Sequence, residues 1–94
     1  MEIIVDKINI PIIIGKNKKH NTEIIIDANY DDLWFHITDK PSAHVIAYVS
    51  NINLTNKQKK QVVHKCSKML KMISKYSSSK YLSITYTEIK NVQV

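Results

Sequence analysis

The stretch LWFHITDKPSAHVIAYV, residues 33–49, decides the fold because it has the pattern of two strands joined by a turn. Its two ends, LWFHI at 33–37 and HVIAYV at 44–49, are rich in aromatic and β-branched residues, which favour strands. The polar TDKPSA segment between them contains Pro41 and is typical of a turn. The sequence therefore predicts a β-hairpin over residues 33–49.

Side chains alternate between the two faces of a strand, so Leu33, Phe35 and Ile37 point one way and Trp34 and His36 the other. The first set has the composition of a core. The second set has two interpretations. It is either an exposed surface on which nucleic-acid bases stack, or a second buried face with a hydrogen-bonded histidine.

The register of the hairpin decides whether two histidines meet. If residue 36 lies opposite residue 44, His36 and His44 stand together on one face, although the sequence alone does not fix that register. With ordinary pKa values near ~6.5, such a pair would gain positive charge as the pH falls toward ~6. We therefore expect anion binding at this face to strengthen over that range.

Working outward, four further runs have the pattern of strands: EIIV at 2–5, INIPIII at 8–14, TEIII at 22–26 and YLSITYT at 81–87. Pro11 favours a sheet edge for the second run. The third run is short enough to be a helical turn instead. NVQV at 91–94 is a candidate last strand. The polar GKNKKHN at 15–21 is predicted to be a turn or loop.

A long amphipathic helix is predicted over about 55–76. It starts with a capping-box pattern, Thr55 followed three residues later by Gln58. At ~100° per residue, one sector of the helix is apolar and the opposite sector is cationic. The apolar positions are Val62, Val63, Cys66, Met69, Leu70 and Ile73, and the cationic stripe is Lys57, Lys60, His64, Lys68, Lys71 and Lys75.

These elements predict a single α+β domain over residues 1–94. Its sheet, mixed or antiparallel, has five or six short strands, and the long helix packs on one face. The chain has one cysteine, Cys66, so it forms no internal disulfide, and the thiol is expected to be an inert core group. No signal peptide or membrane span is expected, and a reducing, cytoplasmic compartment fits.

The formal net charge is +6, and it is unevenly distributed. Residues 1–54 contain five lysines and seven acidic residues, whereas residues 55–94 contain nine lysines and one acidic residue. This basic half predicts an anionic partner such as RNA or DNA, with the helix stripe as a second basic patch. A solvated helix face is the alternative interpretation of the stripe. All basic residues are lysines, which favours recognition of the backbone over base reading, although an AT-rich genome also explains the missing arginine.

An enzymatic interpretation uses His36, His44, Asp32 and Ser42 as a hydrolase or nuclease site. No nucleophile elbow, zinc-binding helix motif or carboxylate cluster supports it. We therefore expect no catalytic residues, no metal and no cofactor, and RNA processing by the histidine pair is the third hypothesis.

Three segments together resemble the NFACT-R family: IGKNKKHNTEI at 14–24, DLWFHITDKPSAHVI at 32–46 and YTEIKNV at 86–92. The family pattern is G-[KR]-N, D-[LI]-W-[FL]-H, P-[GS]-[SA]-H-V and a final Y-T-x-[VWI]-K. The match extends over about residues 10–94 and is closest to the small eukaryotic members. Ser42 stands where glycine is usual.

The resemblance implies a nucleic-acid-binding module that binds RNA, without the tailing activity of the larger ribosome-quality-control relatives. The expected partner is tRNA or rRNA, on the ribosome, or DNA. A protein-interaction adaptor that docks on a ribosomal or quality-control factor is the alternative, and a viral source would place the chain in the host cytoplasm. The candidate contact residues are Lys16, Asn17, Lys18, Lys19, Asn21, Trp34, His36, Lys40, Ser42 and His44.

Overall fold

The computed structural model describes residues 1–93 and shows an α+β domain, as predicted. Within residues 1–93, five strands form one antiparallel sheet in the order β1-β2-β4-β3-β5. The elements follow one another as β1 (Glu2–Val5), β2 (Ile8–Ile14), α1 (Lys18–Asp27), β3 (Leu33–Ile37), β4 (Val45–Ala47), α2 (Asn56–Ile73), β5 (Ile84–Glu88) and the short 3-10 helix η1 (Ile89–Asn91).

The long helix packs on the sheet as the sequence predicts. Thr55 caps α2, its hydroxyl accepting from the Gln58 amide while the Gln58 side chain accepts from the Thr55 amide. Val62, Cys66 and Leu70 are fully buried against strand residues that include Phe35. Burial raises the pKa of the Cys66 thiol to about 12, which fits an inert core group. The helix ends at Ile73, three residues before the predicted end.

The prediction of a strand at 22–26 is wrong, because these residues belong to α1. The Asn17 side chain accepts a hydrogen bond from the His20 amide and so starts a helix inside the segment predicted to be a loop. Ile24 and Ile25 are buried next to each other and Ile26 is 66% exposed, a pattern that a strand does not produce. Only residues 15–17 of the predicted loop lie outside the helix.

The expectation that Pro11 marks an edge strand is also wrong. β2 lies between β1 and β4, and it changes partner along its length: residues 8–11 pair with β1 and residues 12–14 pair with β4. Pro11 lies just beyond the paired residues of β2 and β4. On that side its carbonyl accepts a hydrogen bond from the Tyr48 amide, and no N–H donor is needed. The missing proline N–H is therefore tolerated inside the sheet.

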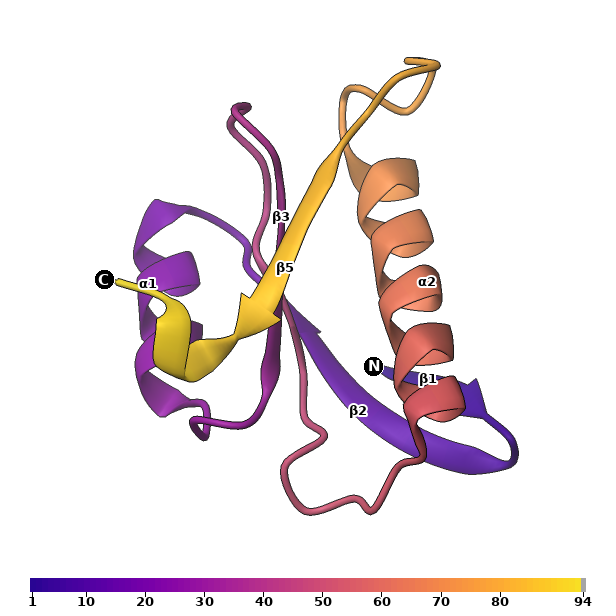
Figure 1. Ribbon diagram of the computed structural model, residues 1–94. Helices are drawn as coiled ribbons and strands as arrows, with labels where there is room; N and C mark the ends of the chain where they lie inside the picture. Colours follow the sequence, from indigo (N-terminus) through magenta and orange to yellow (C-terminus); the bar gives the residue numbers. More distant parts are fainter. Residues whose placement is uncertain (94) are drawn as a thin grey trace.

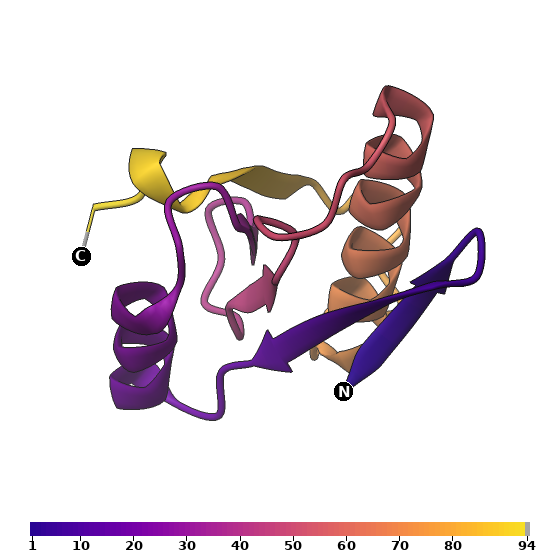
Figure 2. The ribbon, with the colours of Figure 1, turned by 90° about the horizontal axis from the view of Figure 1, so that it is seen from below.

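The chain forms three layers, with α1 and α2 on opposite sides of the strands (Figure 1). The view from below shows the same separation (Figure 2). α2 covers the larger core, whereas α1 and η1 cover a smaller one that contains Ile24, Ile25, Ile46 and Ile89. The predicted last strand at 91–94 is not formed by residues 91–93, and Val94 lies outside the described residues.

Candidate functional site

The β3–β4 hairpin has the even register that brings the histidines together. Trp34 pairs with Ile46 and Phe35 with Val45, so the next position places His36 opposite His44. The two imidazole centroids are 4.8 Å apart, with the rings nearly perpendicular. Both side chains point to the α1 side of the sheet, because their strand neighbours Phe35 and Val45 belong to the core under α2.

Trp34 is half-buried and joins this pair to the smaller core. Its indole lies parallel to the His36 ring at 5.6 Å and meets the His44 ring edge-on at 5.3 Å. The indole Nε1–H donates a hydrogen bond to Nδ1 of His44 at 3.1 Å. That bond requires an unprotonated Nδ1, so it fixes the neutral His44 tautomer with its proton on Nε2.

The expectation that the histidines have ordinary pKa values is wrong. Burial lowers the pKa of His36, and burial together with the neighbouring His36 lowers the pKa of His44 to about 4. Both imidazoles are therefore neutral near neutral pH. They act as hydrogen-bonding groups, and His44 does not become cationic as the pH falls toward ~6.

Gly15 allows a close approach between β2 and the first part of α1. Its amide donates to the His44 carbonyl at 2.8 Å, and Asn21 Oδ1 accepts from the His44 amide at 3.2 Å. A Cβ at position 15 would lie 1.6 Å from Asn21 Oδ1. Only glycine fits at position 15, because the Asn21 side chain occupies the space that a Cβ would need.

The amino end of α1 lies beside the histidine pair. Asn17 caps the helix, and the Lys16 amide donates to Nδ1 of His20 at 2.9 Å. The amides of Lys18 and Lys19, at the first two helical positions, have no partner within the helix. Unpaired amides at the positive end of a helix dipole, next to lysine side chains, favour an anion.

These groups surround one open hollow of about 460 Å³, here called the α1-side hollow. Most of the predicted contact residues lie on its walls. The lining residues are Gly15, Lys16, Asn17, Lys18, Asn21, His36, Pro41, Ser42, Ala43 and His44.

Three predicted contact residues do not line the α1-side hollow. Trp34 lies under the histidines, Lys19 is 89% exposed beside Glu23 at 4.0 Å, and Lys40 lies over the Tyr76 ring, 5.0 Å from its centroid. Gly15, Pro41 and Ala43 line the hollow, although their residue types carry no chemistry that marks them as contacts in the sequence.

The residues of the enzymatic hypothesis, Asp32, His36, Ser42 and His44, are not arranged as a catalytic site. Asp32 is fully buried, and its carboxylate accepts from the amides of Asn29 and Ser50. It precedes His36 by four residues of extended chain, a separation of ~13 Å. The Ser42 hydroxyl accepts from the Ile37 amide and donates to the Ala43 carbonyl, so it holds the turn.

The cationic stripe of α2 lies on the other side of the molecule. Lys57, Lys60 and His64 line a separate open hollow of about 370 Å³ with Lys65 and Asp6, here called the α2 hollow. Lys68 is exposed further along the helix, Lys71 is half-buried, and Lys75 lies over the Tyr76 ring at 5.4 Å. The sheet separates the stripe from the α1-side hollow, so one flat partner surface does not cover both.

Among residues 1–93, no three histidine, cysteine or acidic side chains are grouped so that they could hold a metal ion. Over the same residues, neither helix has the length and apolar character needed to cross a bilayer.

The fold therefore presents a basic hollow between the amino end of α1 and the histidine-bearing β3–β4 hairpin. Residues 3–94 match the family described as NFACT protein RNA binding domain, and the chain belongs to that family. Its resemblance to NFACT-R, noted from the three sequence segments, is thereby confirmed.

A solved structure shares the fold. It is titled the C-terminal of the fibronectin/fibrinogen-binding protein from Streptococcus suis, and it superimposes with a TM-score of 0.74 at 23% identity. The match covers 99% of this chain and 36% of that chain, so this domain corresponds to about a third of the solved protein. No curated protein matches the sequence significantly.

Proposed function

We propose that this chain is a non-catalytic module that binds RNA through the α1-side hollow. The observation that carries the proposal is the convergence of Lys16, Lys18 and the open amino end of α1 on the same hollow as His36 and His44. Phosphate oxygens suit the cations and the unpaired helix amides. The neutral imidazoles suit ribose hydroxyls or base edges, which are hydrogen-bonding rather than charged groups.

The family to which the chain belongs is described as an RNA-binding domain, which supports RNA over DNA as the ligand. Within that class we propose a structured RNA, tRNA or rRNA, on the ribosome in the cytoplasm. The hollow is shaped by backbone amides and lysines without any arginine, so recognition depends on the phosphate backbone and shape more than on sequence.

A pair of charge-matched variants tests the proposal. The first combines Lys16→Gln with Lys18→Gln, and the control combines Lys7→Gln with Lys80→Gln, whose side chains are exposed and line neither the α1-side nor the α2 hollow. Both variants lower the formal net charge from +6 to +4. Binding to tRNA is measured by fluorescence anisotropy over a series of salt concentrations.

We expect the Lys16/Lys18 variant to bind tRNA more weakly than the control and to lose about two units of the log–log salt slope, because each phosphate contact contributes about one unit. Equal binding by the two variants would show that only net charge matters and that the α1-side hollow is not the RNA-binding site. An unmodified chain that binds no RNA at low salt would favour the protein-adaptor hypothesis.

A further inference from the structure

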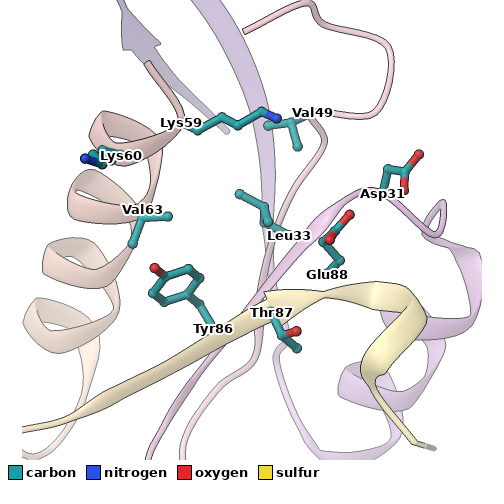
Figure 3. Close-up of a pocket in the computed structure, with 9 residues that line it drawn as sticks. All are labelled: Asp31, Leu33, Val49, Lys59, Lys60, Val63, Tyr86, Thr87 and Glu88. Atoms are coloured by element: carbon teal, nitrogen blue, oxygen red, sulfur yellow. The ribbon is translucent and has the colours of Figure 1, made fainter. Parts of the chain in front are cut away.

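A third hollow lies on the α2 side of the sheet, where β5 forms the sheet edge (Figure 3). It has a volume of about 490 Å³ and is here called the β5 hollow. Leu33, Val49 and Val63 give it an apolar floor, and Tyr86 reaches across from β5 toward α2. The volume is in the range of small-ligand sites, ~300–1,000 Å³.

Tyr86 gives the β5 hollow an aromatic wall that is already held in place. Its ring centroid is 6.0 Å from that of the fully buried Phe35, at an interplanar angle of 28°. Tyr86 is nevertheless 52% exposed, so part of the ring faces the hollow. An aromatic ring fixed on one side and open on the other is a platform on which a nucleic-acid base stacks.

Lysines border the β5 hollow on its helix side. Lys59 and Lys60 come from the first turns of α2, and neither belongs to an ion pair with any residue in the described part of the chain. Lys60 also borders the α2 hollow, beside Lys57 and His64. A track of positive charge therefore leads out of the β5 hollow and onto the exposed face of α2.

Carboxylates border the β5 hollow on its sheet side. Glu88 and Asp31 both lie near the Lys90 ammonium, at 3.5 and 3.7 Å. Carboxylates repel a phosphate but accept hydrogen bonds from the N–H groups of bases. The two sides of the hollow therefore suit a nucleotide whose phosphate faces α2 and whose base lies between Tyr86 and the acidic residues.

From this arrangement we infer that the β5 hollow binds one unpaired base of a single-stranded RNA segment, whose phosphates lie along Lys59 and Lys60. The inference rests on the proposed RNA-binding function and adds to it a second contact on the opposite face of the sheet. The RNA that this chain binds therefore contains an unpaired strand as well as a structured part.

The test compares two RNAs and two tyrosine variants of the full chain. The RNAs are a single-stranded oligoadenylate and a fully paired duplex, and affinity is measured by anisotropy. Tyr86→Leu removes the aromatic ring but keeps an apolar side chain on Phe35. Tyr81→Leu is the matched control, because Tyr81 is 91% exposed and lines none of the three hollows.

We expect Tyr86→Leu to weaken binding of the oligoadenylate about tenfold and to leave binding of the duplex unchanged, which also shows that the variant is folded. Tyr81→Leu should change neither. The combined change Lys59→Gln with Lys60→Gln should also weaken oligoadenylate binding more than the Lys7/Lys80 control does.

Equal affinities of Tyr86→Leu and Tyr81→Leu for the oligoadenylate would overturn the inference. The same result is expected if the β5 hollow binds a peptide instead of RNA. The proposed function would still stand if the Lys16/Lys18 variant bound tRNA more weakly than its control. Failure of the unmodified chain to bind any of the RNAs would overturn both.

Discussion

The two faces of the sheet differ in what fills them. On the α2 side, Val62, Cys66 and Leu70 are fully buried in a continuous apolar core. On the α1 side the apolar core is smaller, and it adjoins a hydrogen-bonded set that links Trp34 and Asn21 through His44. The α2 core therefore mainly holds the fold together, whereas the α1 side mainly holds polar groups in position at an open hollow.

The largest expected effect concerns the α2 core. Leu70→Ala removes a fully buried side chain and leaves a cavity, so it should lower the free energy of unfolding by ~2–5 kcal/mol. Met72→Ala, on the same helix but 68% exposed, should change it by less than ~0.5 kcal/mol. Urea denaturation measures both. Similar values for the two variants would contradict the packing of α2 on the sheet.

The next effect concerns the polar side. Gly15→Ala places a methyl group where Asn21 Oδ1 lies and displaces that side chain from the His44 amide. The half-buried amide then loses its partner, at a cost of ~1–3 kcal/mol in unfolding free energy. In a chain that already carries Asn21→Ala, the same glycine substitution should cost clearly less. A double-mutant cycle in urea measures the difference, and additive costs would show that the two positions do not interact.

Trp34→Phe tests the contact between the indole and the histidine pair. The substitution keeps an aromatic ring but removes the Nε1–H that donates to His44 Nδ1, with a loss of ~0.5–1.5 kcal/mol in unfolding free energy. The freed Nδ1 takes up a proton more easily, so the pKa of His44 should rise. An NMR titration of the imidazole signals follows that pKa, and an unchanged value would argue against the hydrogen bond.

A further effect is the pH dependence of stability. The pKa of His44 is about 4 in the folded chain and has its ordinary value of 6.5 when the chain is unfolded. The unfolded chain therefore binds the proton first, so stability is complete above about pH 6.5 and decreases as the pH falls toward about 4. His44→Gln should reduce this slope, and an unchanged slope would contradict the lowered pKa. Urea denaturation at several pH values measures it.

The sequence predicted the elements whose signals are local and strong. α2 combines a capping box with a regular apolar sector, and β3 alternates between residues of the α2-side core and residues that face α1. α1 was missed because TEIII has the composition of a strand. The available signal was Asn17, a favoured helix-capping residue at the start of a basic segment.

The candidate site was predictable in its residues but not in its electrostatics. The G-K-N segment and the histidines could be chosen from the sequence, yet the lowered pKa values depend on burial that only the packed structure provides. Lys40 could not be separated from the contact residues, because its position over Tyr76 depends on where α2 ends. The β5 hollow joins residues from four separate segments, so no sequence pattern marks it.

Backbone amide NMR during a titration with tRNA shows directly whether RNA binds at the α1-side hollow. The earliest and largest changes should occur at the amides of Lys16, Lys18 and His44, which line the hollow, while Val62 in the α2 core stays unchanged. Unchanged signals at those three amides, with changes confined to other parts of the chain or absent altogether, would contradict it.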